Sequence, residues 1–146
     1  MVDDVQTLVA ARLRRVGQRH TGGRRQLVES LARAERPLTA AELVGGDHRL
    51  PQSTTYRNLA LLERAGVVHR VMGGDELARF ELAEELTGRH HHHLVCVSCG
   101  SMEDFEAPGP VERGLAAAFG QFQAGTGFRA HAHRLDLLGT CAKCAG

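Results

Sequence analysis

The feature that most constrains this chain is the placement of its four cysteines. They form two C-x2-C pairs, Cys96 with Cys99 and Cys141 with Cys144, and 41 residues lie between the pairs. A gap of two residues lets both sulfurs of a pair point at one ion, and four thiolates complete a tetrahedron around zinc. The spacing therefore predicts a structural zinc site that ties the last residues to an earlier segment. The alternatives are free buried thiols or a redox pair.

The length of 146 residues fits one domain or two small ones. No apolar run approaches the roughly 20 residues that cross a bilayer. The first residues are acidic and lack an apolar stretch followed by a cleavage site. We therefore expect a cytoplasmic protein without a membrane segment. In that compartment paired cysteines are more often metal ligands than disulfides.

The net charge of +1 conceals an uneven distribution. Residues 12–57 contain ten arginines and four acidic residues. A concentrated basic region is typical of proteins that contact phosphate, but a solvated helix face has the same composition. Charge alone leaves both interpretations open.

The first 82 residues predict a winged helix-turn-helix domain. Apolar residues recur at helical spacing up to Gly17, and a second helix starts near Thr21. Thr39 and Glu42 form the capping-box pattern of a third helix, and Pro51 stands in the first turn of a fourth. Two β-type runs, VVHRV and ARFEL, follow with two glycines between them, which indicates a hairpin.

The pattern changes at residue 90. Three segments resemble strands, HHHHLVCVS, SMEDFE and GFRAHAHRLDLLG, and an amphipathic helix lies between the second and third. They predict a small α/β dimerisation domain over residues 90–146, with a three-stranded antiparallel sheet. Residues 83–89 are the predicted hinge. The fold class is therefore α+β.

The four consecutive histidines predict two metal sites. Side chains of a strand alternate between its faces, so His90 and His92 point one way while His91 and His93 point the other. His131 and His133 share a face of the predicted last strand and could join one pair. Histidine and carboxylate ligands suit zinc, iron, nickel or manganese. The alternative is a solvated polar strand.

Several segments together resemble the ferric uptake regulator superfamily in order and spacing: STTYRNLALLERAGVVHRV, RFEL, HHHHLVCVSCG and HRLDLLGTCAKC. The resemblance covers roughly residues 12–144. It implies a homodimer with an N-terminal winged helix and a C-terminal dimerisation domain, which binds palindromic operator DNA when loaded with metal. It also implies that the four cysteines hold structural zinc. The ligand pattern is most similar to that of zinc uptake regulators.

The resemblance also assigns DNA contacts. It places Tyr56 and Arg57 on the recognition helix, where they would contact thymine methyls, a base edge or phosphate. Arg19 matches a basic residue that reaches toward the minor groove. From the residues alone, Tyr56 is equally compatible with a place in the core.

Two regulatory metal sites follow from the same resemblance. One set is His90, His92, Glu112 and His133. The intervening loop, which contains Pro108 and Pro110, is one residue longer than is usual in the family. At the second site His91 and His93 are matched, but Pro37 stands where iron and peroxide sensors have a histidine. His69 occupies the place of a zinc-sensor ligand, and Glu81 replaces a cysteine, with Glu84 or Glu85 as alternatives. The predicted second set is therefore His69, Glu81, His91 and His93.

The sequence thus predicts a metal-dependent transcriptional repressor, zinc-responsive and not an enzyme. Within the family, the alternatives are sensors of iron, manganese, nickel or peroxide, with Fe²⁺, Mn²⁺ or Ni²⁺ in place of regulatory Zn²⁺. A metallohydrolase would need a general base and an open metal position, and the chain has no His-Glu-x-x-His helix. A zinc-ribbon interaction module or a metal store is the third class.

Overall fold

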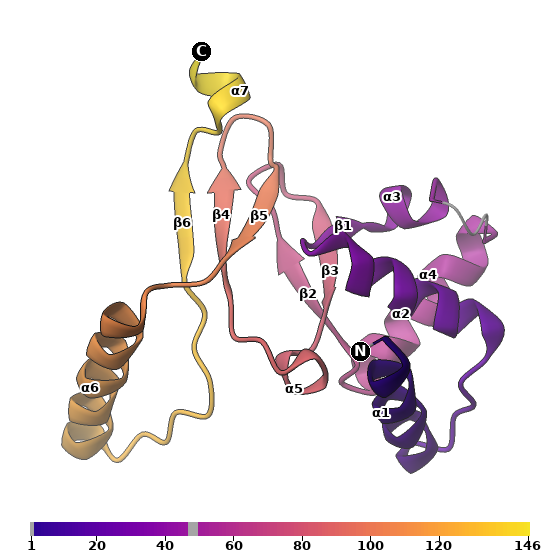
Figure 1. The fold of residues 1–146 in the computed structure, drawn as a ribbon, viewed down its shortest axis with the longest axis horizontal. Coiled ribbons are helices and arrows are strands. Elements are labelled where there is room, and N and C mark those ends of the chain that lie inside the picture. Colours follow the sequence, from indigo (N-terminus) through magenta and orange to yellow (C-terminus); the bar gives the residue numbers. More distant parts are fainter. Residues whose placement is uncertain (1, 47–49) are drawn as a thin grey trace.

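The computed structural model describes residues 2–46 and 50–146, and Figure 1 shows two parts joined by a short helix. The N-terminal part contains α1 (Val2–Arg15), α2 (Gly22–Ala34), β1 (Leu38–Thr39), α3 (Ala40–Val44), α4 (Gln52–Arg64), β2 (Val68–Met72) and β3 (Ala78–Leu82). The connecting helix is α5 (Glu84–Thr87). The C-terminal part contains β4 (His92–Cys96), β5 (Met102–Phe105), α6 (Gly109–Thr126), β6 (Asp136–Gly139) and α7 (Ala142–Ala145). The predicted α+β class is confirmed.

The helices of the N-terminal part begin at the residues that the sequence indicates. The Thr21 hydroxyl accepts a hydrogen bond from the backbone of Arg24 and caps α2. Thr39 and Glu42 form both hydrogen bonds of a capping box at α3. Each cap satisfies a backbone N–H that the first helical turn leaves unpaired. Pro51 precedes α4, the predicted recognition helix.

The hairpin of β2 and β3 corresponds to the wing predicted from the sequence, and we call it the wing. β1 extends it to an antiparallel sheet in the order β1-β3-β2. Its register places His69 opposite Glu81. The helices and this sheet enclose an apolar core to which each of α1, α2 and α4 contributes residues that are almost completely buried, among them Val9, Leu13, Leu27, Val28, Leu59 and Leu62.

The predicted hinge contains an ordered helix. Ala83 and Leu86 are buried in the N-terminal core, and the Ala83 N–H donates to the Val67 carbonyl at 3.0 Å. The first half of the 83–89 segment is therefore attached to the N-terminal part.

The C-terminal sheet has three strands, in the order β5-β4-β6, but the prediction that it is antiparallel was wrong for the last strand. β5 pairs with β4 antiparallel, whereas β6 pairs with β4 in parallel. The long connection that contains α6 carries the chain to the other edge of β4, as parallel pairing requires. β6 is also shorter than predicted, so His131 and His133 precede it.

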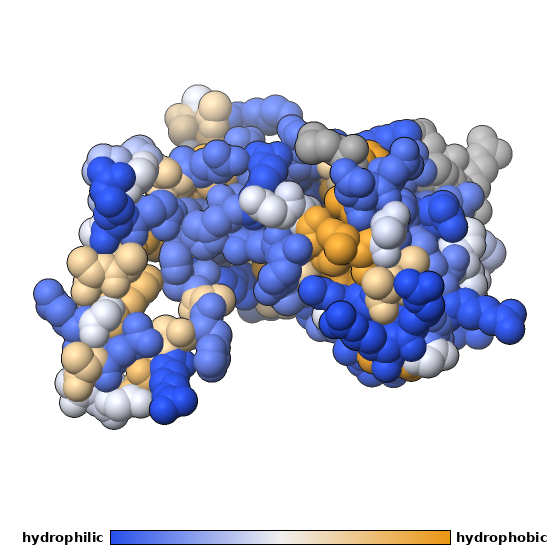
Figure 2. Space-filling model, turned by 60° about the horizontal axis from the view of Figure 1, so that its bottom comes forward, coloured by the Kyte–Doolittle hydropathy of each residue, from blue (hydrophilic) through white to orange (hydrophobic). Residues whose placement is uncertain are grey.

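The helix α6 projects from the rest of the molecule at the left of Figure 1. None of its residues is buried, although several apolar side chains of this region are large: Val111, Phe122, Phe128, Leu137 and Leu138. Figure 2 shows pale and orange side chains on the same projecting lobe. Among the described residues, no helix combines the length and apolar character needed to cross a membrane.

The wing packs against the turn between β4 and β5. Val71 of the wing forms a small buried cluster with Val95 and Met102. At Gly100 the backbone φ is +76°, and a Cβ there would lie 2.2 Å from the Asp75 carboxyl carbon. Asp75 in turn binds Arg79 through two hydrogen bonds of 2.7 and 2.8 Å. This close approach joins the two parts on the side opposite α5.

Candidate metal sites and nucleic-acid interface

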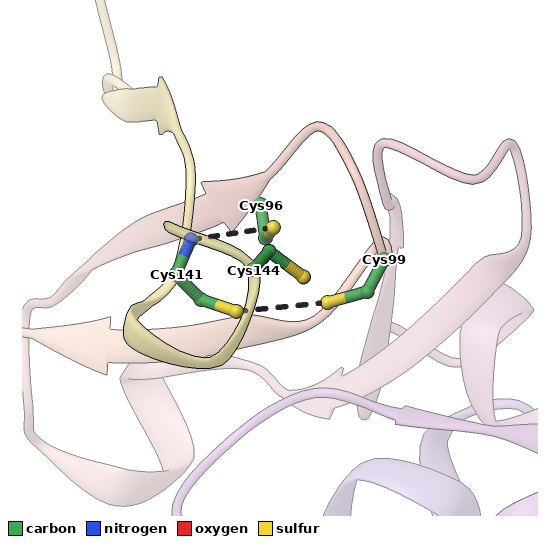
Figure 3. A group of neighbouring side chains, drawn as sticks. All are labelled: Cys96, Cys99, Cys141 and Cys144. Carbon is green, nitrogen blue, oxygen red and sulfur yellow. Dashed lines mark hydrogen bonds between the residues drawn. The ribbon is translucent and has the colours of Figure 1, made fainter. Parts of the chain in front are cut away.

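The four cysteines converge at the end of the C-terminal sheet (Figure 3). Their sulfurs lie within 4.8 Å of one another. Cys96 ends β4, and Cys99 lies in the following turn. Cys141 directly precedes the short terminal helix α7, and Cys144 lies in it. The sulfurs of Cys99 and Cys141 are 3.8 Å apart. We call these residues the cysteine group.

The chemistry of the cysteine group suits a thiophilic cation. The backbone N–H of Cys141 donates to the Cys96 sulfur at 3.3 Å. This bond and further backbone N–H groups lower the pKa of Cys96 to about 6, so its thiolate forms near neutral pH. Four sulfurs at this spacing match a structural zinc site without an open coordination position.

The four histidines divide between two groups, as the alternation of a strand predicts. One group contains His90, His92, Glu112 and His133, which we call the inner group. The other contains Glu81, His91, His93 and Asp104, which we call the hinge group. In each group the ligand atoms lie within 4.8 Å of one another.

The inner group lies within the C-terminal part and joins β4, α6 and the segment before β6. The Nε2 atom of His92 lies 2.5 Å from a Glu112 oxygen, and the Nε2 atoms of His90 and His133 are 3.1 Å apart. Two imidazole nitrogens at that distance must share a proton or face a cation. Hydrogen bonds from His92 lower the pKa of Glu112, which keeps a carboxylate among three imidazoles. The set suits zinc or another transition metal.

The hinge group joins the wing to the C-terminal sheet. One Glu81 oxygen lies 3.0 Å from His91 Nε2 and 2.9 Å from His93 Nε2. Burial raises the pKa of Glu81, but the two histidines more than offset this and lower it to about 2. The hydrogen bond to Glu81 raises the pKa of His91 to about 9. An incoming cation would therefore compete with protons at these rings.

Asp104 supplies an independent indication that the hinge group fits a cation. Its Oδ1 atom is buried and has no hydrogen-bond partner among the described residues. It lies 3.8 Å from His93 Nε2. Burial raises the pKa of Asp104, because removal from water disfavours the charged carboxylate, and the nearby His91 and His93 only partly offset this. A cation would relieve that cost.

The fourth member of the hinge group differs from the sequence-based set. Asp104 joins Glu81, His91 and His93, whereas the predicted ligand His69 is exposed and lies outside the group. His69 pairs directly with Glu81, so both side chains lie on one face of the wing. The sequence indicated that SMEDFE is a strand, but only the structure shows that Asp104 pairs with His93 across the sheet.

The other residues that the sequence analysis considered for this metal site lie outside the hinge group. Pro37 is fully buried. Glu84 contacts His90 at 2.9 Å instead of completing the hinge group, and Glu85 is exposed.

The three residues predicted to contact DNA are exposed on the N-terminal part. Tyr56 is 50% exposed on α4, which excludes its alternative place in the core, and Arg57 follows it on the surface. Arg19 lies in the loop before α2. Arg24 bridges these elements, because its guanidinium donates to the Arg19 carbonyl and to the Asn58 side chain of α4. Asp47 and Arg49 of the basic region lie outside the described residues.

The ferric uptake regulator family model matches residues 15–138. The chain belongs to this family. Its similarity to the peroxide operon regulator of Bacillus subtilis is 31% identity over 137 residues, covering 91% of this chain and 88% of the relative. The ferric uptake regulation protein of Campylobacter jejuni is 30% identical over 138 residues, covering 90% of this chain and 83% of the relative.

The fold agrees with this family assignment. The solved structure of the ferric uptake regulator of Helicobacter pylori superposes with a TM-score of 0.77 at 20% identity, covering all of this chain and 95% of that one. That regulator is described as having three functional metal-binding sites. Relatives named for iron uptake and for peroxide are about equally similar to this chain, so similarity alone does not choose the signal.

Proposed function

We propose that this chain is a zinc-responsive transcriptional repressor that binds palindromic operator DNA as a homodimer when it is loaded with metal. Residues 1–82 would form the DNA-binding domain, 83–89 the hinge and 90–146 the dimerisation domain. The relatives named above are regulators, so we assign no catalytic reaction to the metal-binding groups.

The observation that carries this proposal is that the hinge group takes its members from both parts of the molecule. Glu81 belongs to the wing strand β3, whereas His93 and Asp104 belong to β4 and β5. A cation bound there would be held by ligands from both parts at once. It would therefore favour the relative orientation of the two parts in which all four ligands lie together. Glu81 then holds the wing, and with it α4, in one orientation relative to the C-terminal part. A fixed orientation lowers the cost of placing two recognition helices on DNA together.

The exposed apolar region around α6 and β6 supports the homodimer. Large apolar side chains that remain exposed in one chain are typical of an interface. Phe122 of α6 is 66% exposed and Leu138 of β6 is 71% exposed. Leu138 also lines a hollow of 360 Å³ on the sheet, together with Leu94 and Leu137. A second copy placed on this face would bury them.

The hinge group also favours a second candidate, a sensor of iron or manganese. Two carboxylates and two imidazoles form a harder donor set than the predicted set with three imidazoles. Affinities measured in vitro will not decide between the ions, because zinc binds most such sites more tightly than iron or manganese. The ion whose depletion from cells derepresses the target gene would decide.

The proposal is tested by selecting binding sites from a random duplex library with buffered zinc and with a chelator. We expect a palindrome to be enriched only with zinc, and the selected duplex to bind with a steep salt dependence in fluorescence anisotropy. His91→Ala should remove most of the zinc-dependent gain, on the order of 5- to 150-fold. His131→Ala is the matched control, because this exposed histidine belongs to neither group.

If neither zinc nor iron, manganese or nickel enriches any sequence, the repressor proposal is wrong. In the same assay, His69→Ala tests the predicted ligand that lies outside the hinge group. An unchanged zinc response would remove His69 from the regulatory site and leave Asp104 in its place.

A further inference from the structure

Glu84 connects the two histidine groups. It is the first residue of α5, and one of its oxygens lies 2.9 Å from His90 Nδ1, the ring atom that faces away from the inner group. Its other oxygen accepts the backbone N–H of His91, a residue of the hinge group, at 3.2 Å. Among the described residues, no other side chain contacts both His90 and the backbone of His91.

The contact with His90 determines which ring nitrogen is available to the inner group. A carboxylate beside Nδ1 requires that Nδ1 carry the proton and donate it. The lone pair then stays on Nε2, which lies 3.1 Å from His133 and 3.6 Å from Glu112. Carboxylates that hold a metal-binding imidazole in this way fix both its tautomer and its orientation.

The backbone of Glu84 belongs to the other half of the molecule. Ala83 precedes it and Leu86 follows it, and both are buried in the N-terminal core. The carboxylate of Glu84 therefore extends from the N-terminal part to a ring of the inner group. All four members of that group come from the C-terminal part, so the carboxylate of Glu84 links the group directly to α5.

We propose that Glu84 is a positioning residue that holds His90 ready for a cation in the inner group and attaches that group to α5. Loading of the inner group then fixes α5 against the C-terminal sheet, in addition to the constraint exerted by the hinge group. This inference deepens the proposed function, since it assigns the inner group a route to the DNA-binding part.

Zinc affinity of the inner group tests the proposal directly. The measurement uses the full chain carrying His91→Ala, so that the hinge group is disabled and the exchangeable zinc reports on the inner group. Competition with a chromophoric chelator should show that Glu84→Ala weakens zinc binding about 10- to 100-fold. Glu84→Gln keeps one acceptor oxygen and the side-chain shape, so it should cause a smaller loss. Glu85→Ala is the matched control on the same helix and should change nothing.

A double-mutant cycle separates positioning of His90 from other effects. In a His90→Ala background, adding Glu84→Ala should not weaken zinc binding further. Hydrogen exchange should show that zinc protects the amides of α5 in the parent and not in Glu84→Ala. An undiminished affinity in both Glu84 variants, or an equal loss with and without His90, would overturn the proposal. These measurements use no DNA, so a negative result in them can be distinguished from a failure of the repressor assay.

Discussion

The N-terminal and C-terminal parts of this chain are held together by different forces. The N-terminal part encloses an apolar core of residues from four helices and the wing sheet, with Leu27 and Leu62 almost completely buried. In the C-terminal part the buried apolar residues are Val95, Cys96 and Met102, and α6 buries none of its residues.

This difference indicates where metal and partner matter for folding. A small sheet with so little buried apolar area cannot offset the conformational entropy that it loses on folding. The cysteine group and the expected dimer interface must supply what the core does not. The N-terminal part needs neither, so the two parts should respond differently to the same change.

The largest effect should follow from loss of one cysteine ligand. Cys144→Ser should reduce the zinc content by about one ion per chain, because four thiolates hold a structural site. The sheet around β4 should then lose hydrogen-exchange protection and the dimer should dissociate, while α1 to α4 keep theirs. Elemental analysis, hydrogen exchange and sedimentation measure the three effects.

Ser98→Ala is the control for this cysteine variant, since Ser98 is exposed in the turn that carries Cys99. If both parts lost protection together in Cys144→Ser, the N-terminal part would not be independent of zinc, and the contrast between the two parts would be wrong.

A core truncation should produce the reverse pattern. Leu27→Ala in α2 leaves a cavity in the N-terminal core and should lower its free energy of unfolding by about 2 to 5 kcal/mol. Zinc content and dimerisation should stay unchanged. Denaturation monitored by helical circular dichroism measures the first quantity. Leu8→Ala is the control, because Leu8 is 47% exposed on α1; an equal loss from both variants would contradict the assignment of the core.

The sequence predicted those features that depend on neighbours along the chain. The caps at Thr21 and Thr39, the alternation of the histidines and the pairing of cysteines two residues apart are local patterns with local physical causes. The four cysteines therefore lie together as expected.

Features that depend on tertiary contacts were harder to predict. The direction of β6 follows from where the connection through α6 returns to the sheet, and the residues of β6 do not encode this. Asp104 carries no motif, since a single acidic residue on a strand becomes a candidate ligand only once the strand is paired. Leu86 is an isolated apolar residue in a polar segment, so its attachment to the N-terminal core had no periodic signal.

The smallest of the three effects should appear where the two parts meet. Gly100→Ala places a methyl group 2.2 Å from the Asp75 carboxyl carbon and 2.5 Å from its Cβ. Asp75 must move away and loosen its bonds to Arg79, whose guanidinium keeps the pKa of Asp75 at about 2. The wing loop should lose exchange protection while the cores of both parts keep theirs. Because Gly100 has a positive φ, the substitution should also lower the free energy of unfolding by about 1 to 3 kcal/mol.

Gly88→Ala is the control that separates the effect of the Gly100–Asp75 contact from the effect of backbone strain. Gly88 has a φ of +68°, close to the +76° of Gly100, but a Cβ added there meets nothing within 4 Å. Loss of wing protection in Gly100→Ala alone would therefore report the contact between the parts. The Cβ of Asp75 alone would lie 2.5 Å from the added methyl group, so the whole side chain must be removed. Asp75→Gly should therefore abolish the difference between the two glycine variants. A difference that persisted would mean that Gly100 acts within the cysteine turn, and that the parts are joined through α5 and the hinge group alone.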